Sequence, residues 1–134
     1  MKNYIVYHNP KSMGYSAREI NELSVVTNKN ARSPEGDRVW ILTGEGAPRK
    51  FYLVGTFIIR VVSASGHEKY PTRLSGTDGQ LFKPIIDIGG EEWFQDLKRN
   101  MGNFAFGFQS IKKERFVRSL ERACASQMPG FGSK

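Results

Sequence analysis

The most constraining pattern in this chain is a long alternation of apolar positions over residues 49–62. Every second position there is apolar or glycine, which is the period of a β-strand with one buried face. The members of that face are Phe51, Leu53, Gly55, Phe57, Ile59 and Val61. Glycine inside a strand favours a bulge or a bend, as barrels often need. The pattern therefore predicts a small, strongly bent sheet or barrel.

Turn residues divide the rest of the chain into short elements. We expect strands over residues 3–8, 24–27 and 37–43, a helical turn within 17–23, loops over 11–18 and 28–36, and helices over 91–99 and 112–123. Asp78-Gly79 predicts a hairpin turn between strands 71–77 and 80–88. Residues 101–109 predict an extended segment with its phenylalanines on one face.

These elements predict an α+β fold, a small bent β-barrel of about five or six strands with two or three short helices. We expect a single domain over residues 1–123 and a flexible C-terminal tail over residues 124–134.

Residues 36–44 predict a turn, a strand with one large aromatic residue, and a second glycine turn. Trp40 on such a strand favours a platform for a flat ligand, and a nucleobase is the flat ligand that suits a basic protein. The alternative is that Trp40 is a core residue, because tryptophan is highly buried on average.

The charge balance favours a polyanionic partner. Lys and Arg number 20 against 13 Asp and Glu, so the net charge is +7, and an excess of this size suits nucleic acid. No run reaches the roughly 18 apolar residues of a spanning helix, and residues 1–10 lack the apolar centre of a signal peptide. Cys124 is the single cysteine, which fits a reducing compartment. We expect a cytoplasmic protein with no membrane partner.

The residue patterns of common catalytic sites are missing or badly spaced. The histidines and the cysteine form no zinc-binding pattern, and Gly44-Glu45-Gly46 predicts a hairpin turn rather than a phosphate loop. Asp87, Asp96 and Lys98 formally fit a nuclease metal pattern. Asp96 and Lys98 fall on an expected helix, however, where positions two apart point away from each other. We therefore expect no enzyme activity, no cofactor and no metal.

Several segments, in order, resemble the EVE family of the PUA-like superfamily, which is related to the YTH readers of methylated adenine. They are residues 9–20 (NPKSMGYSAREI), 27–32 (TNKNAR), 36–40 (GDRVW), 53–58 (LVGTFI) and 103–111 (NFAFGFQSI). The likeness spans about residues 3–122. Two positions depart from the family pattern, because Asn9 stands where an acidic residue is usual and Thr27 where an arginine is usual.

The resemblance implies a small barrel whose mouth takes a flipped-out base between aromatic side chains. Trp40 would be the stacking wall, with Tyr15 or Phe106 as a second aromatic. The implied base-edge contacts are Ser16, Asn9, Thr43, Asn103 and Gln109, and the implied phosphate contacts are Lys11, Arg18, Arg32, Arg49 and Lys50. The alternatives are core packing for Phe104 and Phe108 and an ordinary solvated face for the basic residues.

The leading expectation is a non-catalytic reader of DNA that contains a modified base. Such a reader would be the specificity module of a larger restriction or defence protein, joined to or associated with a nuclease or an NTPase. The alternatives are an RNA-binding PUA-like domain and a small enzyme that acts on nucleotides or RNA. Preference for methylated over plain duplex DNA favours the first, whereas metal-dependent cleavage favours the enzyme.

Overall fold

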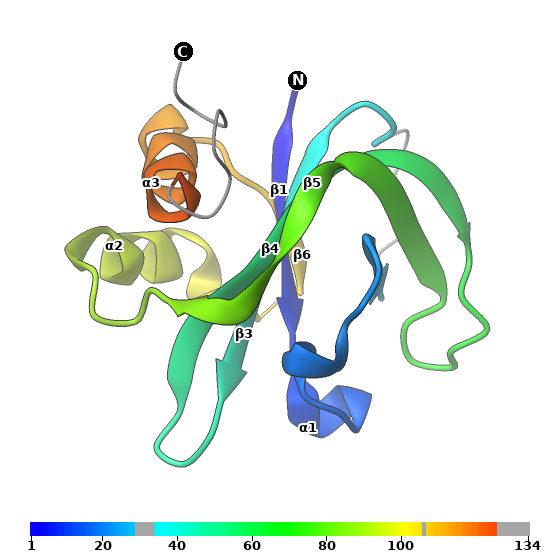
Figure 1. Cartoon of the computed structure of the whole chain (residues 1–134), viewed down its shortest axis with the longest axis horizontal. Coiled ribbons are helices and arrows are strands. Elements are labelled where there is room, and N and C mark those ends of the chain that lie inside the picture. The colour runs from blue at the N-terminus through cyan, green and yellow to red at the C-terminus, as the bar shows by residue number, and fades with distance from the viewer. Residues whose placement is uncertain (29–33, 106, 126–134) are drawn as a thin grey trace.

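The structure is a computed structural model that describes residues 1–28, 34–105 and 107–125. Its elements in chain order are β1 (Asn3–His8), α1 (Pro10–Met13), the short 3-10 helix η1 (Ala17–Glu19), β2 (Ser24–Thr27), β3 (Arg38–Glu45), β4 (Lys50–Ala64), β5 (Thr72–Asp87), α2 (Glu92–Asn100), the short 3-10 helix η2 (Gly102–Phe104), β6 (Phe108–Ser110) and α3 (Glu114–Cys124). Figure 1 shows their arrangement. The expected strands over residues 3–8 and 24–27 are confirmed at both ends.

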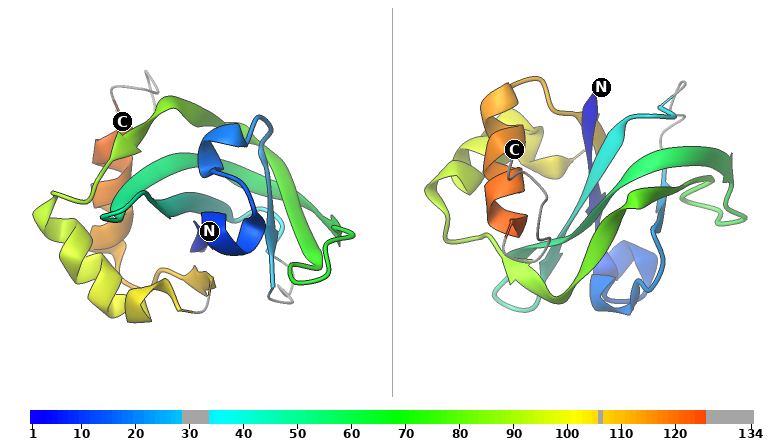
Figure 2. Two further views of the ribbon diagram at one scale, coloured as in Figure 1. Left: turned by 90° about the horizontal axis from the view of Figure 1, so that it is seen from below. Right: turned by 45° about the horizontal axis from the view of Figure 1, so that its top comes forward.

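The strands form one six-stranded sheet in the order β2-β5-β4-β3-β1-β6. Neighbouring strands are antiparallel except β1 and β3, which run in parallel. The sheet curls into a half-barrel, with α2 and α3 against one face and the N-terminal connection within the curl (Figures 1 and 2). The expected α+β fold with a bent barrel-like sheet is therefore confirmed.

Alternation along β1 and β3 divides the side chains between two cores. The helix-side core, between the sheet and the helices α2 and α3, contains Ile5, Trp40, Leu42, Leu53, Phe82, Ile88, Phe94, Leu97, Met101, Phe104, Ile111, Phe116, Val117, Leu120 and Cys124. The barrel core, within the curl, contains Val6, Ala17, Val25, Val39, Ile41, Val54, Phe57, Ile59, Leu74, Ile85 and Phe108. Residues next to each other on a strand thus belong to opposite faces of the sheet.

Both longer helices form for the reasons the sequence indicates. Helix α2 has Glu92 in its first turn and basic residues in its last turn, which complements the helix dipole. Helix α3 buries an apolar stripe of Phe116, Val117, Leu120 and Cys124.

Glycines allow β4 and β5 to approach each other closely where the sheet bends. A Cβ atom on Gly76 would lie 1.7 Å from the carbonyl oxygen of Ile58, and one on Gly79 would lie 1.9 Å from that of Thr56. The register between the two strands shifts on both sides of Gly55, between Leu53 and Gly55 and again beyond it. The expected bend at Gly55 is confirmed, and side chains at Gly76 and Gly79 are sterically excluded.

The register shifts also change which face each position of β4 occupies. Leu53 packs in the helix-side core, whereas Phe57 and Ile59 pack in the barrel core. Val61 is 54% exposed. The expected single buried face over residues 49–62 is therefore wrong, because each bulge inserts a residue and shifts the alternation.

Three other expectations are wrong. Residues 71–88 do not form a hairpin, because β5 continues through Asp78 (φ 56°) and pairs with the similarly long β4 along both halves. Residues 101–109 do not form one extended segment, because η2 precedes β6 and Phe104 has a φ of 62°. The expected loop over residues 11–18 includes most of α1 and the start of η1.

Replacing Gly79 with alanine should destabilise the fold, because the new methyl group would collide with the backbone of β4. Overpacking of this kind costs about 1–3 kcal/mol. The measurement is urea unfolding of Gly79→Ala and of Gly90→Ala, where an added Cβ has no atom within 4 Å. Gly90→Ala should stay within about 0.5 kcal/mol of the wild type. Equal stability of the two variants would contradict the steric account.

Candidate functional site

A cleft lies between β1 and the edge strand β2. Its inner recess has a volume of about 50 Å³ and is lined in part by His8 of β1 and Val25 of β2. Its outer part has a volume of about 240 Å³. Both parts are lined by Tyr15, Ile20, Ser24 and Arg73. We call this two-part cavity the β1–β2 cleft.

Tyr15 and His8 bring two aromatic rings to the cleft. Tyr15 is 40% exposed, and its ring centroid lies 5.0 Å from that of His8 in an edge-to-face arrangement. The backbone carbonyl of Tyr15 accepts a hydrogen bond of 2.8 Å from Nε2 of His8, which must therefore carry the proton. Burial lowers the pKa of His8, so the ring is neutral near pH 7 and its Nδ1 is an acceptor.

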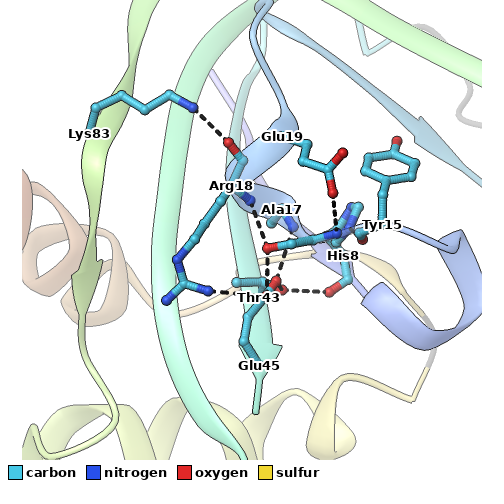
Figure 3. A network of polar contacts seen from close by, with 9 residues as sticks. His8, Tyr15, Ala17, Arg18, Glu19, Thr43, Glu45 and Lys83 are labelled. Carbon is cyan, nitrogen blue, oxygen red and sulfur yellow. Dashed lines mark hydrogen bonds and ion pairs between the residues drawn. The ribbon is translucent and has the colours of Figure 1, made fainter.

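Glu45, at the end of β3, fastens the segment that carries Tyr15 (Figure 3). Its Oε1 accepts hydrogen bonds from Ser16 Oγ at 2.7 Å and Arg18 Nη1 at 3.3 Å. Its Oε2 accepts one from the backbone N–H of Ala17 at 3.0 Å, and Thr43 Oγ1 lies 2.8 Å away. The carboxylate is only 8% exposed, so these bonds satisfy a buried charge.

The electrostatics of Glu45 follow from these contacts. Burial by itself would raise the pKa of Glu45, but the hydrogen bonds that it accepts, led by the one from Ser16, outweigh burial and lower the pKa. A capping box between Ser16 and Glu19 closes the same turn. Lys83 of β5 donates hydrogen bonds to the carbonyl oxygens of Arg18 at 2.9 Å and Ile20 at 3.0 Å. The segment below the cleft is thus held from both β3 and β5.

Arg73 reaches the cleft from β5. Its Nη1 donates a hydrogen bond of 2.9 Å to Oγ of Ser24, which lies 3.3 Å from Oγ of Ser75. The half-buried guanidinium borders both parts of the cleft. Sequence reasoning missed Arg73 and Glu45, since neither stands in a recognisable motif.

Trp40 does not line the cleft. It is 0% exposed in the helix-side core, on the face of the sheet opposite the cleft, and its Nε1–H donates a hydrogen bond of 3.0 Å to Oδ1 of Asn3. The expectation of a Trp40 stacking wall is corrected, because no part of its ring is accessible to a ligand. The structure agrees with the alternative interpretation, in which Trp40 is a core residue.

The other implied base-edge residues divide into two groups. Ser16 and Thr43 lie beside the cleft, but their hydroxyl groups are bound to Glu45. Asn9 caps α1 through its Oδ1, which accepts from the N–H groups of Lys11 at 3.1 Å and Ser12 at 3.4 Å. These three side chains therefore position the backbone around the cleft.

The remaining aromatic and amide candidates lie elsewhere. Asn103 is in η2, next to α2, and Gln109 pairs with Ile5 and so shares the helix-side face. Phe104 stacks on Tyr7 and Phe108 on Tyr4, which fits the core alternative for both phenylalanines. Phe106 lies outside the described residues. Of the implied pocket aromatics that the structure describes, Tyr15 alone borders the cleft.

The implied phosphate contacts are mostly exposed. Lys11 lies on α1, and Arg49 and Lys50 lie where β3 turns into β4, at the same end of the molecule (Figure 1). The side chain of Arg18 is 53% exposed and pairs with Glu45. Arg32 lies outside the described residues.

The residues of the formal nuclease pattern have local partners. Asp87 accepts a hydrogen bond of 3.0 Å from the N–H of Gly89. Asp96 pairs with Arg99 and Arg115. Within residues 1–28, 34–105 and 107–125, no group of His, Cys, Asp and Glu side chains is placed to hold a metal ion. Burial raises the pKa of the Cys124 thiol to about 11, which argues against a reactive thiolate.

Comparison with models of protein families, with curated proteins and with solved structures finds no match to this chain. In the part of the chain that the structure describes, no helix has both the length and the apolar character needed to cross a membrane.

Replacing Glu45 with glutamine should loosen the segment below the cleft and destabilise the protein by about 1–3 kcal/mol at pH 7. Because folding lowers the pKa of Glu45, its contribution to the free energy of unfolding is complete above about pH 4.5, its ordinary value. That contribution is lost as the pH falls through the folded-state pKa. Glu45→Gln should lack this part of the pH dependence.

The measurement is urea unfolding at a series of pH values. Glu68→Gln, on the exposed loop between β4 and β5, is the matched control and should behave as the wild type does. A Glu45→Gln protein with wild-type stability and an unchanged pH profile would rule out the role assigned to this carboxylate.

Proposed function

We propose that this chain is a non-catalytic reader domain that binds DNA containing a modified base and takes that base, flipped out of the duplex, into the β1–β2 cleft. The observation that carries the proposal is the exposed ring of Tyr15 beside a two-part cavity between β1 and β2 of a curled sheet. A barrel-like fold with aromatic side chains at a cleft is compatible with a binding domain.

The size of the cleft suits one flat ring better than a large cofactor. The outer part measures about 240 Å³ and the inner recess about 50 Å³. Together they lie just below the range of about 300–1,000 Å³ for small-molecule sites. The outer part is bordered by exposed residues such as Tyr15 and Glu22, so a base still attached to its sugar has a path in.

Stacking on Tyr15 supplies part of the energy that flipping requires. Taking a base out of a duplex costs on the order of a few kcal/mol. Stacking on an aromatic side chain contributes about 1–3 kcal/mol per base. The hydrogen bond from His8 and the Glu45 contacts hold the Tyr15 segment in place before the ligand arrives, which reduces the entropy lost on binding.

The surface charge supports contacts with the flanking phosphates. The chain has a net charge of +7, and Lys11, Arg49 and Lys50 are exposed at the end of the molecule where β1 and β3 finish. Lysine and arginine that neutralise phosphates release counterions and provide affinity that depends on salt.

The EVE resemblance of the sequence supports the same reading, since it implies a small barrel that takes a flipped base. On this basis the chain acts in the cytoplasm as the specificity module of a restriction or defence system. A nuclease or an NTPase, fused to it or associated with it, supplies the enzymatic activity of that system.

The same cleft and charges also suit an unpaired base in structured RNA, because stacking does not distinguish the two nucleic acids. A structured RNA bound more tightly than every modified duplex would favour the RNA-binding alternative. Metal-dependent cleavage that is lost in both Asp87→Ala and Asp96→Ala would favour an enzyme.

Tyr15→Ala should weaken binding to the preferred modified duplex by about 5- to 150-fold, which corresponds to about 1–3 kcal/mol of lost stacking. Tyr15→Phe keeps the ring and should bind almost as the wild type does. The measurement is fluorescence anisotropy with duplexes that carry a single cytosine, 5-methylcytosine, 5-hydroxymethylcytosine or N6-methyladenine at the same position.

Affinity for every duplex should also fall steeply between about 50 and 200 mM salt. A wild-type protein that binds no duplex in this range overturns the proposal. Equal binding by Tyr15→Ala and the wild type overturns the assignment of the base to this cleft.

A further inference from the structure

One positive charge stands among the residues that line the β1–β2 cleft. Arg73 borders both the inner recess and the outer part, whereas no other arginine and no lysine is among the described residues that line either part. Tyr15 borders the same two parts, so Arg73 and the Tyr15 ring share one cavity. A guanidinium carries five N–H donors and no acceptor.

Neighbouring side chains hold Arg73 in this position. The hydrogen bond from Nη1 to Ser24 Oγ uses one donor, and Ser24 lies across from Ser75 in the β2–β5 ladder. In the described part of the chain, Arg73 makes no ion pair. The planar group is thus oriented by one neutral partner, and its other donors remain for a ligand.

The charges around Arg73 disfavour a phosphate in the cleft. Glu19 and Glu22 line the outer part together with Arg73, so the lining has a net negative charge. A phosphate entering the cleft would be repelled by both carboxylates, whereas a neutral ring with N–H groups could donate to them. The cleft therefore presents donors from Arg73 and acceptors from the two glutamates to the same occupant.

We infer that Arg73 is the specificity-determining residue of the cleft and that it donates hydrogen bonds to acceptor atoms on the edge of the bound base rather than to a phosphate. This inference rests on the proposed function. Ser24 is a positioning residue for Arg73, and Glu19 and Glu22 accept hydrogen bonds from the amino or imino groups of the same base.

The test compares discrimination with salt dependence. Discrimination is the ratio of the weakest to the tightest Kd across duplexes that differ only in one central base: cytosine, 5-methylcytosine, 5-hydroxymethylcytosine or N6-methyladenine. Arg73→Met should reduce this ratio by about 5- to 150-fold, as expected for loss of a bidentate base contact. The slope of log Kd against log salt concentration should not change.

Matched variants distinguish a loss of base recognition from a loss of protein stability. Ser24→Ala removes the same internal hydrogen bond and should lower the urea midpoint as much as Arg73→Met does, with a smaller loss of discrimination. Arg73→Lys keeps the charge but not the planar fork, so it should also lose discrimination. Arg60→Met, at an exposed position of β4 and paired with Asp78, should change neither the discrimination nor the urea midpoint.

Unchanged discrimination in Arg73→Met, with or without a fall of about one unit in the salt slope, would overturn the inference. The salt slope and Tyr15 dependence would then still support the proposed function. Equal losses of discrimination in Ser24→Ala and Arg73→Met would also overturn it, because Arg73 would then act only through the fold. A wild-type protein that binds no duplex overturns both.

Discussion

The close approach of β4 and β5 at Gly76 and Gly79 is the constraint on which the rest of the structure depends. With no side chain at either position, the carbonyl groups of Ile58 and Thr56 occupy the space that a Cβ would need. The long strands can therefore bend, and the bend brings β2, at the far edge of the sheet, round toward β1. The cleft lies between these two strands, and the other face of the sheet is covered by α2 and α3 (Figure 2).

Much of this fold is predictable from local patterns. Alternation and turn residues locate β1, β2, β3 and β4, and charge at the helix ends locates α2. The failure at residues 71–88 arises because the pairing partner lies outside that segment. Asp78-Gly79 has the composition of a hairpin turn, but β4 offers a continuous partner on both sides, so the pair becomes an irregularity within β5.

The site is less predictable than the fold. Alternation along a strand predicts two faces but does not indicate which of them borders the cleft. Trp40 and Ile41 are neighbours, yet Trp40 belongs to the helix-side core and Ile41 to the barrel core. Glu45 stands in a segment that predicts a glycine turn, and Arg73 stands in an ordinary strand. Their roles depend on Ser16 and Ser24, which are distant in sequence. Tyr15 was identifiable because it stands in the segment that resembles the EVE family.

The central claim is that a base binds in the β1–β2 cleft and not beside Trp40. The most direct test is a titration of the ¹⁵N-labelled protein with the tightest-binding duplex, followed by NMR. We expect the largest shifts at the backbone amides of Tyr15, Val25 and Arg73, while the indole N–H of Trp40, bound to Asn3, keeps its position. Large shifts at the Trp40 indole and along α2 and α3, with an unchanged cleft, would contradict the account.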